Sequence, residues 1–415
     1  MMEYVGKGRK VLIIVENLPS PFDRRVWQEA TTLIQNGYQV SIICPTGKGF
    51  EKKYEVIDNI HIYRHNLPLE ADGALGYLLE YSAALFWEFV LTLRVLFTRG
   101  FDVIHACNPP DNIFLIAGFF KLFGKKFIFD HHDVNPELYI AKFGRRDFFY
   151  KIMLLWEKLT FKTADVSIAT NQSYKKIAID RGNMSPDRVV VVRSGPKLER
   201  MKMVQPNHEL KNGKQYLVGY VGVMGKQEGI DYLLRAVKHI VDVVGRTDIH
   251  FGLVGGGTEL EEMKKYSEEL GVKDYVTFTD RVPDQEMLEM LNTADICVNP
   301  DVANEMNDIS TMNKIMEYMA LGKPIVQFDL IEGRFSALDA SLYAKKNDVV
   351  DMADKIMELM DDPQKRHKMG EFGRNRVINE LEWKYEAPKL LKAYDLLFAP
   401  EATEVVPEFN KENKL

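Results

Sequence analysis

The chain has 415 residues and a formal net charge of -6, so it lacks the basic excess typical of nucleic-acid-binding proteins. Its length predicts two domains, and a hydrophobic content of 46% is ordinary for a soluble protein with a sizeable core. The three cysteines, Cys44, Cys107 and Cys297, are far apart and form neither a disulfide framework nor a metal-ligand motif. We therefore expect a cytoplasmic protein, and we find no export signal at the N-terminus.

The first half of the chain alternates short apolar runs with longer helical stretches. Strands are predicted over 10–17, 39–45, 101–108, 126–133, 165–170 and 188–195, a hairpin over 54–65, and helices over 26–38, 74–100, 111–123, 150–164 and 171–182. Continuous apolar strands that alternate with helices are typical of a parallel sheet covered on both faces. This half is therefore predicted to be an α/β domain.

A polar segment at 194–215 interrupts the alternation and is predicted to be a linker. Strands then follow over 216–223, 249–257, 275–280, 295–300 and 324–329, with helices from 230, from 259, and over 284–292, 311–321 and 383–399. The alternation that resumes predicts a second parallel sheet with helices on both faces.

The predicted fold class is α/β, with two Rossmann-like, doubly wound domains that face each other across a cleft. The N-terminal domain is expected over 1–200 and the C-terminal domain over 201–384. The helix at 385–399 is expected to pack back on the first domain, and 400–415 to form a polar tail. Ligands bind beyond the carboxyl ends of the strands in such sheets, so we expect the site in the cleft.

One region, 74–126, is unusually apolar and aromatic. Its long helix carries Glu80, Glu88 and Arg94, and charges near the centre of a membrane span are costly. Three interpretations stay open: a buried domain helix, which is the ordinary one, a helix that touches a membrane surface, and a true span.

The stretch 307–329 predicts a short helix with a carboxylate, followed by a buried strand. Its apolar residues fall on one face, at Met312, Ile315, Met316 and Met319. Ser310 or Thr311 is expected to cap the helix, whose N-terminus with Lys314 offers an anion site. A phosphate there and a diol at Glu317 would suit a nucleotide, and a plain scaffold helix with a solvated Glu317 is the alternative.

Three glycine-containing or polar turns follow successive strands of the second domain. Gly222, Gly225 and Gly229 form the first turn, Gly255–Gly257 the second, and 279–283 the third. Glycines permit close approach of the backbone to a phosphate, but they also permit tight turns with no ligand. None of these turns matches a P-loop or the GxGxxG pattern, so only their convergence at one sheet edge favours a ligand site.

Polar groups also gather at strand ends of the first domain. His131, His132 and Asp133 end one strand, where a catalytic, a structural and a metal-binding histidine are all open interpretations. The loop after the first strand carries "DRR", which is Asp23, Arg24 and Arg25. Paired arginines suit an acceptor diphosphate, and helix capping by Asp23 beside two solvated arginines is the alternative.

The motif order "VGVMGKQEGIDYLLRA … GLVGGG … VTFTDRVPDQEM … ADICVNP … NKIMEYMALGKPIV" resembles the donor-binding domain of retaining family 4 glycosyltransferases. In the first half, "PSPFDRRVWQEATTLIQNGYQVSIICP" and "FIFDHHDVNPELY" resemble the acceptor side of the same family, above all its exopolysaccharide and O-antigen members. The likeness extends from Val11 to about Ala399 and implies the GT-B fold.

The resemblance also implies roles for particular residues. Glu317 would bind the ribose, the main chain at Arg281 and Val282 the base, and His132 the donor sugar near its anomeric centre. The helix start at Thr311, Met312 and Asn313 would hold the diphosphate. The full predicted donor set is Gly225, Lys226, Gly255, Gly256, Arg281, Val282, Asp308, Thr311, Met312, Asn313, Lys314 and Glu317, with His132, Glu317 and Lys226 as catalytic groups and Asp23, Arg24 and Arg25 on the acceptor side.

The sequence departs from the family pattern in two ways. The family usually has an E-x7-E pair, and its first Glu falls on Ile309 here, so Asp308 or Glu305 is the candidate replacement. The family's usual Arg and Lys for the diphosphate are Val223 and Glu228 here. Lys226 and Lys314 (the cations nearby) are the expected substitutes.

The predicted function is retaining transfer of a sugar from a UDP- or GDP-sugar to a glycan or polyprenyl-diphosphate-linked acceptor, in bacterial surface polysaccharide synthesis at the inner membrane face. No Asp-x-Asp motif occurs in the donor domain, so we expect neither a metal nor another cofactor. A nucleotide-sugar epimerase is the main alternative, and a dinucleotide oxidoreductase and a non-catalytic binding module are further ones.

Overall fold

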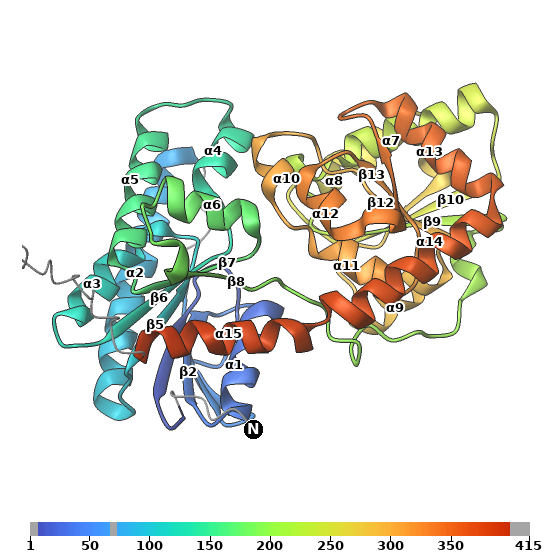
Figure 1. Cartoon of the computed structure of the whole chain (residues 1–415). Coiled ribbons are helices and arrows are strands. Elements are labelled where there is room, and N and C mark those ends of the chain that lie inside the picture. Colours follow the sequence, from blue (N-terminus) through green and yellow to red (C-terminus); the bar gives the residue numbers. More distant parts are fainter. Residues whose placement is uncertain (1–6, 67–72, 399–415) are drawn as a thin grey trace, which may run out of the picture.

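The computed structural model describes residues 7–66 and 73–398, which form two α/β halves, each on a sheet of its own (Figure 1). The first sheet has the order β3-β4-β2-β1-β5-β6-β7-β8, and only β3 runs antiparallel to its neighbour. Its strands are β1 (Lys10–Ile14), β2 (Gln39–Pro45), β3 (Tyr54–Ile57), β4 (Ile60–His65), β5 (Val103–Cys107), β6 (Lys126–His131), β7 (Val166–Ala169) and β8 (Val189–Val191).

The second sheet is parallel throughout, with the order β11-β10-β9-β12-β13-β14. Its strands are β9 (Tyr216–Val221), β10 (Ile249–Val254), β11 (Val276–Phe278), β12 (Ile296–Asn299), β13 (Ile325–Phe328) and β14 (Ser341–Ala344). The chain steps outward from β9 in both directions, so the carboxyl ends of β9 and β12 lie at a topological switch point. The predicted fold class is confirmed.

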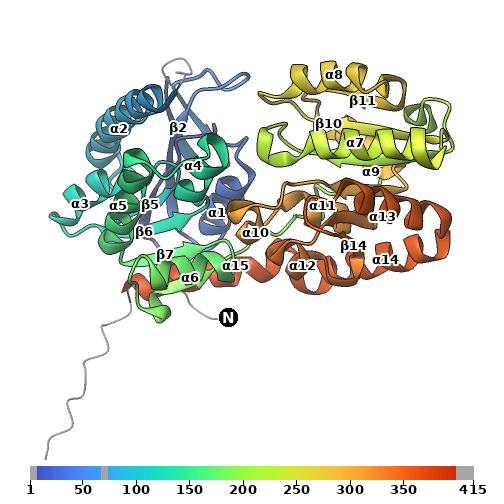
Figure 2. The same cartoon turned by 90° about the horizontal axis from the view of Figure 1, so that it is seen from above.

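Helices cover both faces of each sheet (Figure 2). One face of the first sheet packs on α1 (Arg24–Gln35) and α15 (Trp383–Phe398), and the other on α2 (Gly73–Thr98), α3 (Phe114–Lys121), α5 (Phe148–Thr163) and α6 (Gln172–Asp180). One face of the second sheet packs on α7 (Ile230–His239), α8 (Leu260–Glu269) and α13 (Val349–Asp361), and the other on α9 (Asp284–Thr293) and α11 (Asn313–Ala320).

Strand β14 and helix α13 were not assigned from the sequence, and neither were four further helices. They are α4 (Asn135–Phe143), α10 (Glu305–Ile309), α12 (Ile331–Ala337) and α14 (Pro363–Arg376). Two of them, α10 and α12, are short, and their apolar residues do not repeat long enough to show a helical period. The predicted tail at 400–415 lies outside the described residues.

The last helix, α15, leaves the second half and lies along the first, as the red helix in Figure 1 shows. Trp383, Leu390 and Tyr394 are buried in the core that contains α1, and the Trp383 indole donates a hydrogen bond of 2.9 Å to Thr32 Oγ1. The chain passes between the halves twice, after β8 and before α15, and these two segments lie in contact. A Cβ on Gly195 would lie 2.3 Å from the carbonyl oxygen of Leu381.

The long helix α2 buries two polar residues among apolar ones such as Leu91 and Val95. Glu88 and Thr92 are buried, whereas Phe86, Trp87 and Phe97 are exposed. Among the helices of the described residues, none is both long and apolar enough to span a membrane. The spanning interpretation of 74–100 therefore finds no support in the described part of this helix.

Candidate donor and catalytic site

The glycines of the second half allow three loops to touch one another at the carboxyl edge of the sheet. Gly255 has φ of +133°, and a Cβ there would lie 1.8 Å from the carbonyl oxygen of Gly222. A Cβ on Gly256 would lie 2.3 Å from Asp280 Oδ1 of the next loop. The predicted convergence of the three turns is therefore present, and packing between the loops by itself explains these two glycines.

Helix α11 begins without a side-chain cap, which differs from the expected capping by Ser310 or Thr311. Its N-cap residue is Met312, and no side chain accepts a hydrogen bond from the first turn. The Ser310 and Thr311 hydroxyls are engaged elsewhere: Ser310 donates to Met306 O, and Thr311 Oγ1 accepts from Asn171 of the first half at 3.0 Å. The first amides of α11 thus remain available to an anion.

The side chain of Lys314, in the first turn of α11, is buried and does not reach solvent as expected. Its ammonium is buried and paired with Glu228 and with Asp301, the latter at 3.0 Å. It also lies 4.9 Å from the centroid of the Tyr220 ring. Burial raises the pKa of Asp301 to about 7, against the opposing effect of the Lys314 charge. In this structure Lys314 pairs with two acids, and one of them, Glu228, occupies the position of the family's lysine.

Lys226, unlike Lys314, has an exposed side chain. It lies exposed in the turn before α7 and, with Gly225, lines a surface hollow beside Asp231 and Glu259. Of the two lysines predicted to replace the family's diphosphate cations, only Lys226 is therefore open to solvent.

Glu317 is held in an ion-pair cluster that joins the two halves. Its Oε1 accepts hydrogen bonds from Arg24 of α1 at 3.2 Å and from Arg200 of the linker at 2.9 Å. The same arginines bind Asp284 at the start of α9, at 2.9 and 2.8 Å. Glu317 keeps only 13% of its side chain exposed, so it is not a solvated surface acid.

The loop predicted to face the base also meets the first half. The Arg281 guanidinium lies 4.8 Å from the ring centroid of Phe22, which precedes α1, and Val282 is partly buried against the core beside α11. Phe22, Arg24 and the loop after β11 therefore surround one corner of the cleft.

The position of the family's first Glu has a different role here. Ile309 packs against the apolar core of the first half, and its carbonyl accepts a hydrogen bond from Asn171 at 2.8 Å. Glu305 pairs with Arg146 of the first half at 2.7 Å, and Asp308 pairs with Lys346 and accepts from the Ile331 amide. Residues 305–311 thus dock the donor half on the acceptor half.

On the opposite side of the cleft, His132 follows directly after β6. Its backbone amide donates to Asn108 Oδ1 at 2.6 Å, and its Nε2 lies 2.6 Å from Asp130 Oδ2. His131 points to the other face of the sheet, where burial lowers its pKa to about 3. The two histidines therefore cannot share a metal ion, and His132 alone retains some exposure.

The three residues of the "DRR" sequence have different partners. Asp23 caps α1 by accepting from Val26 N at 3.0 Å, Arg24 crosses to Glu317, and Arg25 turns into the first half. The Arg25 guanidinium is buried between Asp130 and Glu29, at 2.9 and 3.2 Å. The expectation that both arginines face an acceptor diphosphate does not fit the buried position of Arg25.

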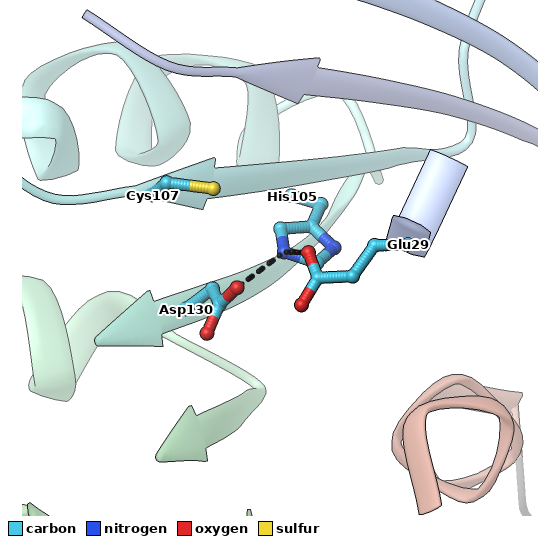
Figure 3. A group of neighbouring side chains, drawn as sticks. All are labelled: Glu29, His105, Cys107 and Asp130. Atoms are coloured by element: carbon cyan, nitrogen blue, oxygen red, sulfur yellow. Dashed lines mark hydrogen bonds and ion pairs between the residues drawn. The ribbon is translucent and has the colours of Figure 1, made fainter. Parts of the chain in front are cut away.

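Four buried groups around Arg25 belong to the types that bind transition metals (Figure 3). They are Glu29 on α1, His105 and Cys107 on β5, and Asp130 on β6. Burial, and then the nearby carboxylates, raise the pKa of the Cys107 thiol well above its ordinary value. The guanidinium of Arg25 already pairs with the carboxyl groups of this cluster. It supplies the positive charge that a metal ion would otherwise bring.

Several residues of the site were not predicted. Arg200 lies in the linker and Asp284 at a helix start, and neither position carries a motif. Asp130 could have been found, because it lies two residues before His132, and residues two apart on a strand share a face. Its other partners, such as Arg25 and His105, are remote in sequence.

Comparison with known proteins gives two family models. Residues 23–200 match "Glycosyltransferase Family 4" and residues 215–362 match "Glycosyl transferases group 1". A D-inositol 3-phosphate glycosyltransferase of Corynebacterium aurimucosum is 26% identical over 57% of this chain and 58% of its own length. The capsular polysaccharide biosynthesis glycosyltransferase CapM of Staphylococcus aureus is 25% identical over 57% and 62%. The chain thus spans less than two thirds of these relatives.

Solved structures match over nearly the whole chain. Sucrose-phosphate synthase from Thermosynechococcus elongatus superposes with a TM-score of 0.76 at 18% identity, covering 94% of this chain and 99% of that one. Anabaena HepE in complex with UDP-glucose gives 0.71 at 14% identity, covering 93% and 99%. At such identities these likenesses show the fold alone. With the two matching family models, they establish that the chain belongs to the family 4 glycosyltransferases and has the GT-B fold.

Proposed function

We propose that this glycosyltransferase transfers a sugar from a nucleoside-diphosphate donor to a hydroxyl of a glycan or polyprenyl-diphosphate-linked acceptor, with retention at the anomeric carbon and without a metal ion. The proposal includes a role in bacterial surface polysaccharide synthesis, in keeping with the capsular relative. Neither an epimerase nor an oxidoreductase is proposed, because the family assignment supports sugar transfer.

One observation carries the proposal. Two consecutive residues of α1 connect the predicted nucleotide-binding and catalytic groups: Arg24 contacts Glu317, and Arg25 Nε lies 2.9 Å from His132 Nε2. Glu317 and His132 therefore face the same cleft from opposite halves, and each contacts one of two neighbouring arginine side chains. A donor with its ribose at Glu317 would extend its sugar toward His132.

The chain offers distinct groups to each part of the donor. Glu317 would accept hydrogen bonds from the ribose hydroxyls, which requires that Arg24 yields its place on Oε1. The uncapped amides of α11 and the exposed Lys226 would hold the diphosphate, because Lys314 is committed to Glu228 and Asp301. The chemistry then depends on stabilising negative charge on the leaving phosphate.

Retention follows most simply if the acceptor attacks the face that the diphosphate leaves. The bond from the anomeric carbon to the phosphate oxygen breaks, the bond to the acceptor oxygen forms, and the departing phosphate takes the acceptor proton. His132 would hydrogen-bond the donor sugar and so fix the reacting carbon. No paired carboxylates of the glycosidase type are needed for this course. The Asp130 carboxylate beside His132 is already paired with Arg25, which supports metal-independent transfer.

The proposal is tested by nucleotide binding. UDP, GDP, UDP-glucose and GDP-mannose are screened by thermal shift, and calorimetry then measures the affinity of the best of them for wild type and Glu317→Ala. We expect the variant to bind about tenfold to a hundredfold more weakly, which is the worth of a hydrogen bond to a charged group. Arg24 and Arg200 keep Asp284 as a partner, so the fold should persist.

The control is Glu286→Ala, an exposed glutamate of α9, which should bind like wild type. Equal affinity of Glu317→Ala and wild type, or stabilisation by none of the four compounds, would contradict the proposed donor site.

We further propose that the first half touches an anionic membrane surface through α2 and α3, where a lipid-linked acceptor would lie. Their exposed apolar side chains form one surface, since the Phe89 and Phe119 rings connect the helices at 5.3 Å. Its members are Phe86, Trp87, Val90, Phe97, Leu115, Phe119, Leu122 and Phe123. Lys121, which pairs with Asp165, ends α3, and Lys125 lies just beyond the helix. Both would meet anionic headgroups.

The surface is tested by sedimentation with vesicles of phosphatidylglycerol and phosphatidylcholine. We expect the wild type to bind, and the Leu122→Ser/Phe123→Ser variant to bind at least tenfold less, because two large apolar side chains no longer enter the membrane. Val243→Ser, an exposed apolar residue of the second half, is the control. Failure of the wild type to sediment at low salt would remove the membrane contact and leave the donor site untouched.

A further inference from the structure

We propose that Asp130, His105 and Tyr394 are positioning residues that hold His132 in a single tautomer, with a proton on Nε2 and a lone pair on Nδ1 for the donor sugar. The proposal deepens the proposed function, because it assumes that the sugar lies against His132. It makes the C-terminal helix α15 a part of the catalytic site, since Tyr394 lies on α15.

A continuous line of hydrogen bonds supports it. The Tyr394 hydroxyl lies 2.7 Å from His105 Nδ1, His105 Nε2 lies 3.3 Å from Asp130 Oδ2, and the same oxygen lies 2.6 Å from His132 Nε2. Tyr394, His105 and Asp130 are fully buried, and His132 keeps 13% of its side chain exposed. The line therefore runs from the core beneath α15 to the cleft.

The direction of each proton follows from the environment. Burial raises the pKa of Tyr394 well above its ordinary value, so the hydroxyl keeps its proton and donates to His105 Nδ1. Burial lowers the pKa of His105, so this ring is neutral and has one N–H left, on Nε2, which donates to Asp130. The whole line then points its donors toward Asp130.

Asp130 must be ionised to accept all of them. Burial opposes its ionisation, but the charge of Arg25 and the histidine hydrogen bonds hold the pKa of Asp130 well below its ordinary value. For Glu29 the opposite holds, because burial and the nearby Asp130 carboxylate raise the pKa of Glu29. With Glu29 protonated, Arg25 and Asp130 form a neutral pair, and Asp130 keeps its negative charge for His132.

The tautomer of His132 rests on a choice between two neighbours of Nε2. Asp130 Oδ2 lies at 2.6 Å and can only accept, whereas Arg25 Nε lies at 2.9 Å and can only donate. A hydrogen bond to a carboxylate at the shorter distance outweighs one from a guanidinium, and Arg25 has Asp130 Oδ2 as another acceptor at 3.3 Å. Nε2 therefore carries the proton.

The other ring atom, Nδ1, is then free for the substrate. Within the described residues, every hydrogen bond of the His132 ring goes through Nε2. The backbone of His132 is fixed separately, since Asn108 Oδ1 accepts from the amides of His132 and Asp133. Ring and backbone are thus held on both sides, and the lone pair of Nδ1 can accept a hydrogen bond from a sugar hydroxyl.

The tautomer is measured directly in the full chain labelled with 15N-histidine, by long-range 1H–15N correlation at neutral pH without substrate. The signals of His132 are those missing from His132→Gln. We expect a protonated Nε2 and an unprotonated Nδ1 in wild type, and a loss of this preference in Asp130→Asn. A ring protonated at Nδ1, alone or together with Nε2, would overturn the proposal.

The role of α15 is tested by Tyr394→Phe, which keeps the ring and removes only the hydroxyl. We expect kcat for sugar release from UDP-glucose or GDP-mannose (whichever binds) to fall about fivefold, the worth of one hydrogen bond, with KM unchanged. Tyr385→Phe is the matched control, because it removes a hydroxyl of the same helix that donates to Ile378 O and takes no part in the line to His132. Equal kcat values for the two variants would overturn the role of Tyr394.

The two measurements separate this inference from the proposed function. An Nε2-protonated His132 in a chain that releases no sugar from any donor would refute the function and leave the hydrogen-bonded line standing. Sugar release by a chain whose His132 carries its proton on Nδ1 would refute only the positioning role of Asp130, His105 and Tyr394.

Discussion

Each half of the molecule buries one cation between two carboxyl groups at the carboxyl edge of its sheet. In the first half Arg25 lies between Asp130 and Glu29, and in the second Lys314 lies between Asp301 and Glu228. In each cluster burial raises the pKa of one acid, Glu29 or Asp301. The charge arrangement is thus the same in both halves.

What the clusters support is different. The first places a carboxylate against His132, a side chain that reaches the cleft. In the second, Lys314 pairs with two acids of its own half and lies beside the uncapped amides of α11. We infer that the first half contributes a reactive side chain to the cleft, whereas the second half contributes mainly backbone groups and helix polarity.

The largest expected effect comes from removing the cation of the first cluster. Arg25→Met should lower the free energy of unfolding by about 3–5 kcal/mol, because it leaves buried carboxyl groups without their counter-charge. Urea denaturation measures the loss. Arg235→Met, which removes a surface i,i+4 pair on α7, should cost less than about 1 kcal/mol. A loss for Arg25→Met as small as that of this control would contradict the comparison.

A second variant separates the chemistry of the two halves. His132→Gln should lower kcat about a hundredfold, the lower end of what a positioned acid–base or hydrogen-bonding group contributes, while nucleotide affinity by calorimetry stays within a factor of two. His239→Gln, at the end of α7, is the control for loss of an imidazole. Weaker nucleotide binding in His132→Gln would show that the halves do not divide the work in this way.

The smallest effect is a change in the pH dependence of stability. Asp301 keeps its proton to about pH 7 in the folded chain but would lose it near its ordinary pKa of 3.8 when unfolded. The folded state binds more protons between these values, so Asp301 makes stability fall as pH rises from about 4 to 7.

Asp301→Asn removes this titration, so its urea midpoint should change less between pH 5 and pH 8 than that of wild type. Other buried acids titrate in the same sense, among them Glu88 and Glu157 with pKa values raised to about 8 by burial, so only the difference between variant and wild type is informative. Parallel pH curves for the two proteins would mean that Asp301 is ionised throughout.

The sequence was sufficient for features that depend on local order. Alternating apolar runs predicted the two sheets, and the residues two apart on β6 place His132 and Asp130 on one face and His131 on the other. The position of Glu317 on a helix between two strands was also predicted, and its role as a ribose ligand stays a prediction.

The sequence was not sufficient where partners are remote. Arg25 has one local partner, Glu29, but the sequence does not show that Arg25 turns inward while Arg24 crosses to the other half. Asp130, which binds Arg25, lies 105 residues away, and Glu317, which binds Arg24, lies 293 residues away. Lys314 was expected to be free, since Glu228 and Asp301 meet it only once three loops converge. Ile309 departs from the family pattern, and the sequence gives no reason for it. The structure does, because Ile309 packs against the core of the first half.

The course of α15 has a consequence for how the chain folds during synthesis. The core of the first half includes Trp383, Leu390, Leu391, Tyr394 and Leu397, which are among the last described residues to be made. The ribosome must therefore release α15 before this core can close. Until then one face of the first sheet stays uncovered, so the second half, whose core is complete earlier, is expected to reach its native state first.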